Sequence, residues 1–181
     1  RKEYRKALDV VKKVNAEQSA NPQFMRICGE VYIENKKYDD ARRILVEAHK
    51  MAPKVTNILN ELIRLYLKMG YFTKAQEYYK IYKACAPSDG VERKQVFYNL
   101  QKALQRPDAE LIEVLEDICN MEYTEEWGFE LALVYRKAGM LNQSVEECTK
   151  LMNTFGNSIY SKWARALKMG SLNVNAAFYC Y

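Results

Sequence analysis

Small side chains recur along this sequence at a nearly constant interval. Steps of 34, 34, 34 and 35 residues separate Ala7, Ala41, Ala75, Ala109 and Ser144. The same interval separates a series of aromatic residues and leucine, which consists of Tyr32, Tyr66, Leu100 and Tyr135. One frame accommodates both series if a single residue is added between Ala109 and Tyr135. A fixed period of about 20 to 50 residues is typical of a protein built from stacked structural repeats.

Each repeat block has the pattern of two helices joined by a short turn. In residues 56–89, apolar residues fall at helical spacing on one face, namely Leu59, Leu62, Ile63, Tyr66 and Leu67. Gly70 interrupts this pattern, and a second apolar stripe follows with Phe72, Ala75, Tyr79 and Tyr82. A small side chain lets two helices approach closely where they cross, so we expect Ala41 and Ala75 at such crossings.

Composition agrees with long helices and short loops. Hydrophobic residues make up 49% of the 181 residues, with only 4 prolines and 7 glycines. No stretch approaches the roughly 18 apolar residues of a membrane span, and no signal peptide is recognisable. The net charge of +5 is small and spread along the chain, which does not favour nucleic acid as a partner. The chain begins at Arg1 within a helical pattern, so we expect a fragment of a longer protein.

Three blocks of the sequence resemble the tetratricopeptide repeat. Residues 22–55 match through Met25, Cys28, Gly29, Tyr32, Tyr38, Ala41, Leu45, Ala48 and Pro53. Residues 56–89 match through Leu59, Leu62, Tyr66, Gly70, Ala75, Tyr79 and Pro87. Residues 125–158 match through Leu131, Ala132, Tyr135, Gly139, Ser144 and Leu151, with Trp127 one position early.

The remaining residues fit the same frame less well. Residues 1–21 resemble the second helix of an earlier repeat, and residues 90–124 resemble a degenerate repeat in which Phe97 holds the small-residue position. We expect a capping helix over residues 159–169, with Trp163, Ala166 and Leu167 on one side. For the tail, residues 171–181, three arrangements stay open: packing on the cap, binding in a neighbour's groove, or disorder.

The resemblance implies an all-α, right-handed superhelical solenoid of antiparallel helix pairs, with residues 1–170 as one domain. It also implies a concave face, lined by the first helix of each repeat, that binds a protein or peptide. Carried over by spacing, the residues of this predicted groove are Arg26, Asn57, Asn60, Arg64, Lys68, Lys94, Tyr98, Lys102, Phe129 and Arg136.

Basic residues in the middle of this predicted groove favour an acidic or carboxylate-terminated segment as its ligand. Some tetratricopeptide domains hold the carboxylate tail of chaperones with a basic clamp. The equivalent positions here are Arg26, Glu30, Glu61, Val91 and Gln95, and the two acidic residues among them argue against that ligand.

The residues do not indicate an enzyme. His49 is the only histidine and has no clustered ligands beside it, so we expect no metal site and no cofactor. Cys28 and Cys148 fall on core positions of the repeat. The five cysteines lack any CxxC pair, and their odd number is consistent with reduced thiols in the cytoplasm.

Two alternatives to a protein-binding scaffold stay open at this stage. The first is an RNA-binding helical repeat, although the groove positions vary from Glu30 to Arg64 to Tyr98 and offer no regular base-reading pattern. The second is a structural module that self-associates through the degenerate repeat or the apolar tail. The sequence leaves the oligomeric state and the identity of the partner open.

Overall fold

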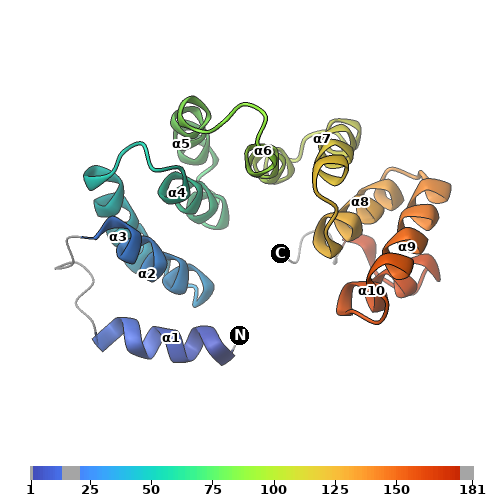
Figure 1. Ribbon diagram of the computed structural model, residues 1–181, viewed down its shortest axis with the longest axis horizontal. Coiled ribbons are helices and arrows are strands. Elements are labelled where there is room, and N and C mark those ends of the chain that lie inside the picture. Colours follow the sequence, from blue (N-terminus) through green and yellow to red (C-terminus); the bar gives the residue numbers. More distant parts are fainter. Residues whose placement is uncertain (1, 14–20, 176–181) are drawn as a thin grey trace. The chain divides into compact units, whose positions relative to one another are not determined.

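The computed structural model describes residues 2–13 and 21–175, and these residues form ten α-helices and no strand (Figure 1). The helices are α1 (Lys2–Lys13), α2 (Pro22–Glu34), α3 (Tyr38–Met51), α4 (Thr56–Lys68), α5 (Phe72–Cys85), α6 (Val91–Ala103), α7 (Asp108–Met121), α8 (Glu125–Lys137), α9 (Leu141–Phe155) and α10 (Ile159–Lys168). The predicted all-α fold is confirmed. Residues 14–20 of the predicted half repeat and residues 176–181 of the predicted tail lie outside the described residues.

The chain divides into two compact units, Arg1–Arg93 and Lys94–Tyr181, called unit 1 and unit 2 below. Unit 1 contains α1 to α5 and the first turn of α6, and unit 2 contains the rest of α6 and α7 to α10. The expectation that residues 1–170 form one continuous solenoid stays a prediction.

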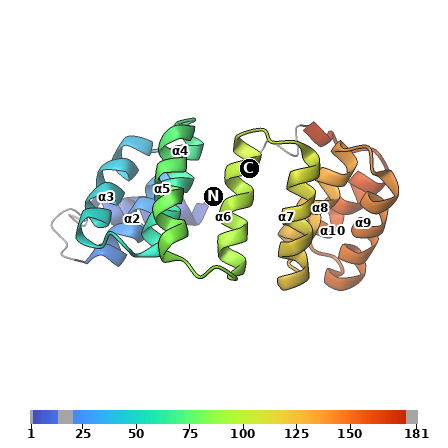
Figure 2. The same ribbon diagram turned by 90° about the horizontal axis from the view of Figure 1, so that it is seen from above.

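Unit 1 consists of two helix pairs and the additional helix α1. Helix α2 pairs with α3, α4 pairs with α5, and α2 and α3 both contact α4 (Figures 1 and 2). The core between them consists of apolar side chains that are fully buried, among them Met25, Leu45, Leu59 and Leu62. At the start of α2, Asn21 Oδ1 accepts hydrogen bonds from the backbone N–H groups of Gln23 and Phe24, which caps the helix.

Small residues lie where paired helices approach closely, as the repeat series predicts. Ala41 and Ala75 have no exposed surface, and Ser144 is 2% exposed. A Cβ atom on Gly29 would lie 2.5 Å from Leu45 Cδ2, so α2 and α3 leave no room for a side chain there. In unit 2, Ser144 Oγ donates a 2.9 Å hydrogen bond to the carbonyl oxygen of Ala132 and joins α9 to α8.

Ala109 is the exception in this series, because it is exposed. Ala41, Ala75 and Ser144 are each the fourth residue of their helix, and the fourth residue of α7 is Leu111, which is 1% exposed. The cause is loop length: residues 86–90 and 104–107 form connections one residue longer than 52–55 and 69–71. Two additional residues therefore precede Ala109, and the prediction of a single added residue after Ala109 was wrong.

Unit 2 ends with the predicted terminal helix, α10, which packs against α8 and α9. Its buried face consists of Ser161, Ala164 and Leu167. Trp163 was expected on the covered side together with Ala166 and Leu167, but its side chain is 38% exposed. Helix α10 therefore covers the end of unit 2 with a face turned relative to the predicted one.

The contrast between Ala75 and Ala109 gives a stability test with a matched control. We expect Ala75→Arg to lower the free energy of unfolding by about 3–5 kcal/mol, since it overpacks a helix crossing and buries an unpaired charge. Ala109→Arg adds the same side chain to an exposed site and should change stability by less than about 0.5 kcal/mol. Denaturant titration followed by circular dichroism measures both. Equal curves for the two variants would contradict the helix-crossing assignment.

Candidate functional site

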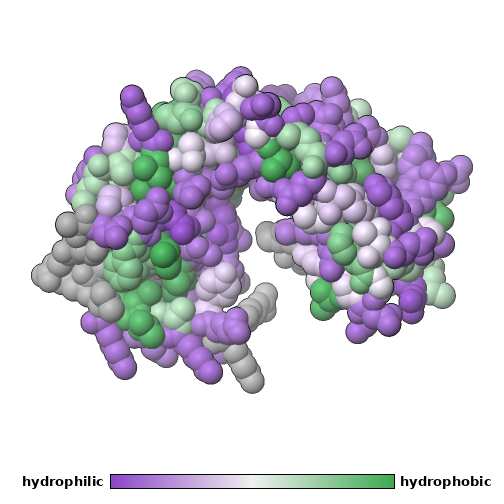
Figure 3. Space-filling view, in the orientation of Figure 1, coloured by the Kyte–Doolittle hydropathy of each residue, from purple (hydrophilic) through white to green (hydrophobic). Residues whose placement is uncertain are grey.

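Polar side chains gather on the part of unit 1 formed by α2 and α4. Figure 3 shows hydrophilic atoms over α4, next to apolar surface elsewhere on the same unit. We call this surface the α2–α4 face and define it by Arg26, Glu30, Glu34, Asn57, Asn60, Glu61, Arg64 and Lys68. Five of these residues, Arg26, Asn57, Asn60, Arg64 and Lys68, belong to the groove predicted from the sequence, and the structure brings them together on two neighbouring helices.

Glu61 is the centre of an ion-pair network on the α2–α4 face. Its carboxylate lies 3.1 Å from the Arg64 guanidinium and 4.0 Å from that of Arg26, while its side chain is only 12% exposed. Arg26 also pairs with Glu30 at 3.3 Å, and Arg64 pairs with Glu34. Both arginines are therefore held in place by carboxylates of the same face, which neutralise much of the positive charge that the sequence analysis assigned to it.

The burial of Glu61 changes its protonation. Desolvation, and then the neighbouring Glu30 carboxylate, raise the pKa of Glu61 to about 7, although Arg26 and Lys68 act in the opposite direction. The charge balance of the α2–α4 face therefore changes near neutral pH. When Glu61 takes up a proton, its negative charge is lost, and the positive charges of Arg26 and Arg64 are neutralised less.

The two asparagines of the face differ in availability. Asn57 is exposed in the first turn of α4 and has no hydrogen bond from its side chain to the described residues. Asn60 is half-buried, and its Nδ2 donates a 3.3 Å hydrogen bond to Glu92, which lies in the unit 1 part of α6. Asn57 therefore offers a free amide, whereas Asn60 already has a partner.

Lys68 is the last residue of α4, and no carboxylate of the described residues forms an ion pair with it. Its side chain is exposed, and it forms no ion pair within that part of the chain. Partial desolvation, followed by the nearby charges of Arg64 and Lys36, lowers the pKa of Lys68. This end of the face is where the positive charge expected from the sequence is retained.

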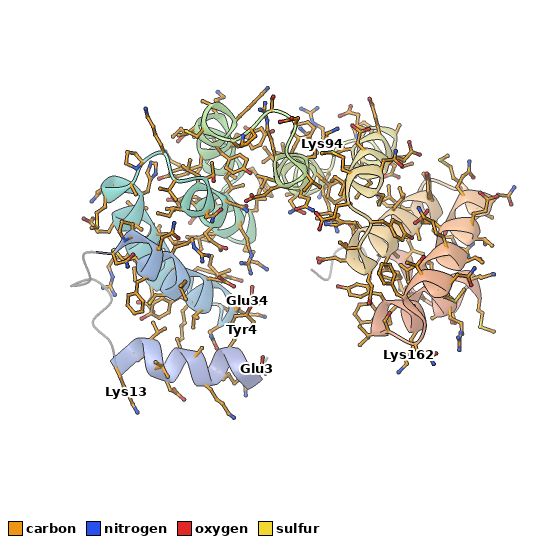
Figure 4. All side chains as sticks on the ribbon, in the orientation of Figure 1. Glu3, Tyr4, Lys13, Glu34, Lys94 and Lys162 are labelled. Atoms are coloured by element: carbon orange, nitrogen blue, oxygen red, sulfur yellow. The ribbon has the colours of Figure 1, made fainter. Side chains whose placement is uncertain are left out.

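Helix α1 contributes Tyr4, which lies in the block predicted to be the second helix of an earlier repeat. The Tyr4 hydroxyl donates a 3.5 Å hydrogen bond to Glu30, and the Tyr4 carbonyl oxygen accepts a 2.9 Å hydrogen bond from Asn35 Nδ2. Figure 4 shows Tyr4 beside Glu34 at the end of α2. The first turn of α1 therefore adjoins the α2–α4 face. In the sequence, the only signal for this contact is the position of Tyr4 relative to α2 in the repeat frame.

In unit 2, Tyr98 and Lys102 lie in a polar cluster at the core. Tyr98 is 1% exposed, and its hydroxyl donates a 2.6 Å hydrogen bond to Glu130, which is itself 5% exposed. Lys102 forms an ion pair with the same carboxylate. The ring of Trp127 meets the Tyr98 ring edge-on at 5.7 Å. These contacts join α6 to α8, so Tyr98 does not line an exposed groove.

The other predicted residues of unit 2 also have internal partners. Phe129 is 1% exposed and packs against Tyr160 and Trp163. Arg136 donates a 3.2 Å hydrogen bond to the carbonyl oxygen of Leu167, near the end of α10. Lys94 forms an ion pair with Asp117 of α7 (Figure 4). These side chains therefore hold the helices of unit 2 together.

A one-residue difference in frame explains the placement of Lys94, Tyr98 and Lys102. The sequence frame started the third block at residue 90, but α6 starts at Val91 after the longer connection 86–90. One residue corresponds to about 100° around a helix, so these positions turn from the solvent side to the packed side. Tyr98, and not Phe97, therefore takes the place that Gly29 has in α2 and Ala132 has in α8.

The reactive side chains of the described residues are placed as packing groups. Burial raises the pKa of Cys28, and raises that of Cys148 to about 11, which keeps both thiols protonated near neutral pH. Both have no exposed surface, which confirms their predicted core positions. His49 Nδ1 is buried without a hydrogen-bond partner, the His49 ring meets Tyr78 edge-on at 5.4 Å, and burial lowers the pKa of His49.

Two further features were considered as a basis for a functional site, namely a cluster of metal ligands and a membrane-spanning helix. No group of three or more potential metal ligands occurs among residues 2–13 and 21–175. Within the same residues, every helix is too short or too polar to cross a membrane.

The raised pKa of Glu61 predicts a pH dependence that Glu61→Gln removes. In the unfolded chain this carboxyl titrates near 4.5, so the folded state holds the proton more tightly between pH 4.5 and about 7. The resulting stabilisation is present below pH 4.5 and is lost as the pH rises through 7. Relative to Glu61→Gln, the wild-type protein should lose up to about 3 kcal/mol of stability between pH 4.5 and 8. Denaturant unfolding across this range measures the difference, and parallel pH profiles would refute the assignment.

Comparisons with known proteins agree with the helix pairs described above. Residues 32–92 match the family model described as tetratricopeptide repeat. The comparison with curated proteins gave no match. Among solved structures, the fold is similar to that of TTC0263, a thermophilic TPR protein from Thermus thermophilus, with a TM-score of 0.66 and 20% sequence identity. That alignment covers 88% of this chain and 89% of the other.

Two further structures show the same fold similarity. Pseudomonas aeruginosa PilF aligns with a TM-score of 0.64 and 16% identity, over 87% of this chain and 79% of that one. YrrB, a TPR protein with an unusual peptide-binding site, aligns with a TM-score of 0.57 and 9% identity, over 98% and 92% of the two chains. Residues 32–92 therefore match the tetratricopeptide repeat model, and the described helices of this protein have a fold similar to that of solved TPR proteins.

Proposed function

We propose that this protein is a scaffold that binds a polypeptide segment of a partner, and that the α2–α4 face of unit 1 holds an acidic group of that segment. The fold supports a protein-interaction role, since helical repeats expose long rows of side chains from successive helices. The observation that carries the proposal is the exposed Lys68 at the end of a face whose arginines are already paired.

The paired arginines limit what the face can recognise. Arg26 and Arg64 have their guanidinium groups on Glu30, Glu34 and Glu61, so a ligand carboxylate would have to displace one of these. Lys68 has no such partner among the described residues, and the charges of Arg64 and Lys36 near it make an added negative charge favourable. We therefore assign the ligand's acidic group to Lys68. This proposed site is smaller than the broadly basic groove expected from the sequence.

The spacing along α4 sets the length of the segment. Asn57 and Lys68 are eleven residues apart, which corresponds to about 16 Å along a helix. An extended chain of about five residues covers this distance. Asn57 can donate to a ligand carbonyl and accept from a ligand N–H group at one end, while Lys68 binds a side-chain or terminal carboxylate at the other. This arrangement recognises the backbone and the negative charge of the ligand, and an extended peptide presents both.

The cysteines support a reducing compartment for this interaction. Cys28, Cys85, Cys119 and Cys148 are all free thiols. Three of them, Cys28, Cys119 and Cys148, are buried. Because free thiols persist in reducing surroundings, we propose the cytoplasm as the place where the scaffold works.

Reversal of the Lys68 charge tests the proposal. The probe is a fluorescein-labelled peptide of four Ser-Leu-Asp repeats with a free C-terminal carboxylate, titrated with the full chain and followed by fluorescence anisotropy. We expect Lys68→Glu to weaken binding about tenfold, which corresponds to about 1.4 kcal/mol. Lys80→Glu is the matched control, because Lys80 is exposed on α5 and has no ion pair with the described residues.

Two measurements complete this test. Thermal unfolding of both variants should match that of the wild-type protein, since neither lysine packs in the core. Equal weakening by Lys68→Glu and Lys80→Glu would show that only net charge matters, and unchanged binding by Lys68→Glu would exclude this face as the acidic-group site.

A further inference from the structure

Helices α8 and α10 of unit 2 have the same relation to each other as α2 and α4 of unit 1. Helix α8 starts 103 residues after α2, and α10 starts 103 residues after α4. Both pairs are in contact. The α2–α4 face therefore has an equivalent in unit 2, which we call the α8–α10 face and define by Glu125, Glu126, Phe129, Tyr160 and Trp163.

The α8–α10 face is aromatic where the α2–α4 face is polar. Phe129 takes the place of Arg26, and the centroid of its ring lies 5.9 Å from that of Tyr160 and 5.7 Å from that of Trp163. The rings of Tyr160 and Trp163 lie 5.2 Å apart and meet nearly at right angles, at 77°. Phe129 is only 1% exposed, whereas Trp163 is 38% exposed. The aromatic cluster therefore has a buried base and an edge that reaches the surface.

Carboxylates border this aromatic cluster. Glu125 and Glu126 belong to the first turn of α8, and neither forms an ion pair with the described residues. Burial raises the pKa of Tyr160, and the negative charges of Glu126, Glu125 and Glu130 raise it further, because these carboxylates lie near the ring. Glu130 already pairs with Lys102. The unpaired negative charge beside the rings therefore comes from Glu125 and Glu126.

The α8–α10 face is not the side of α10 against which a second helix packs. On α8 that side is marked by Ala132, whose carbonyl oxygen accepts the hydrogen bond from Ser144 of α9. The equivalent residue of α10 is Ala166, and residues 174–175 begin the next helical turn after it. Tyr160 lies six residues before Ala166 and is turned from it by about 120° around the helix. A second helix beside Ala166 therefore leaves the Tyr160 side of α10 open.

We propose that the α8–α10 face binds an arginine side chain of a partner polypeptide, with the guanidinium group between the exposed rings and the carboxylates of α8. A guanidinium is planar and weakly hydrated, so it stacks on an aromatic ring while it donates hydrogen bonds to a carboxylate. The face offers both groups, the exposed ring of Trp163 and the unpaired carboxylate of Glu126. An acidic side chain would be repelled here, and an apolar one would leave the negative charge unmatched.

The distribution of charge along the chain supports a cationic ligand for unit 2. Unit 1 contains 19 basic and 12 acidic side chains, whereas unit 2 contains 9 basic and 11 acidic ones. Lys162 is the basic residue next to Trp163 in the sequence, and its side chain points away from unit 2 (Figure 4). The proposed site is thus independent of the Lys68 site in unit 1, and it selects the opposite charge.

A basic peptide and a neutral control peptide test the proposal. The probe is a fluorescein-labelled peptide of four Gly-Ser-Arg repeats, and citrulline replaces arginine in the control, which removes the charge and keeps the shape. Both are titrated with the full 181-residue chain under reducing conditions and followed by fluorescence anisotropy. We expect the arginine peptide to bind at least tenfold more tightly. No binding of the arginine peptide, or equal binding of the two, would overturn the proposal.

A third peptide, with lysine in place of arginine, tests the choice of side chain. Lysine carries the same charge but has no planar group that stacks on a ring. We expect it to bind at least threefold more weakly than the arginine peptide. Equally tight binding of the lysine peptide would refute the assignment to arginine.

Carboxylate variants of the chain locate the binding surface. Glu125→Gln combined with Glu126→Gln should weaken binding of the arginine peptide at least fivefold. The matched control is Glu110→Gln with Glu113→Gln, because both carboxylates are exposed on α7 and neither has an ion pair with the described residues. This control should keep the wild-type affinity. Equal weakening in the two double variants would show that only net charge matters and would place the site elsewhere.

Ring variants of Trp163 separate stacking from charge. Trp163→Leu should weaken binding of the arginine peptide at least fivefold, and Trp163→Phe, which restores a ring, should weaken it less than twofold. Thermal unfolding of both variants checks that they are folded. Equal affinity of the leucine and phenylalanine variants would exclude stacking. Lys68→Glu should not weaken binding of the arginine peptide, so failure at one of the two sites is distinguishable from failure at the other.

Discussion

Close contact between paired helices is the constraint on which the rest of the structure depends. Ala41, Ala75 and Gly29 let the backbones approach, and Leu45 occupies the space that a side chain on Gly29 would need. The pairing of each helix with the next one decides which side chains are buried and which remain exposed. The α2–α4 face exists because α3 and α5 cover the opposite sides of those two helices.

Polar contacts take over where small residues are missing. In α6 the place of the small residue is taken by Tyr98, whose ring and hydroxyl reach Trp127 and Glu130 of α8. Lys102 adds its charge to the same carboxylate. This buried carboxylate is specific in geometry, since removal of Lys102 leaves its charge without a counter-charge and removal of the Tyr98 hydroxyl takes away a hydrogen-bond donor. The degenerate repeat thus keeps its helix in place through directional bonds.

The period of 34 residues was enough to predict the fold, because the small residues at which paired helices cross form a regular series in the sequence. The start of α10 could be predicted for the same reason. The candidate site was harder to predict, because side-chain direction depends on the exact start of each helix. Tyr98 and Lys94 were assigned to solvent, since the sequence frame did not contain the additional loop residue before Val91. The ion pairs were equally hard to predict from the sequence. Glu61 approaches both Arg26 and Arg64, and its contact with Arg26 forms only because α2 packs on α4.

The longer connection at residues 86–90 has a wider meaning for how such chains diversify. Inserting one amino acid before a helix rotates every following side chain of that helix by about 100° without altering a single one of them. An inherited recognition surface can in this way be exchanged for another by a change in spacing alone. Length variation between repeats is therefore a source of new binding chemistry, alongside the replacement of individual residues.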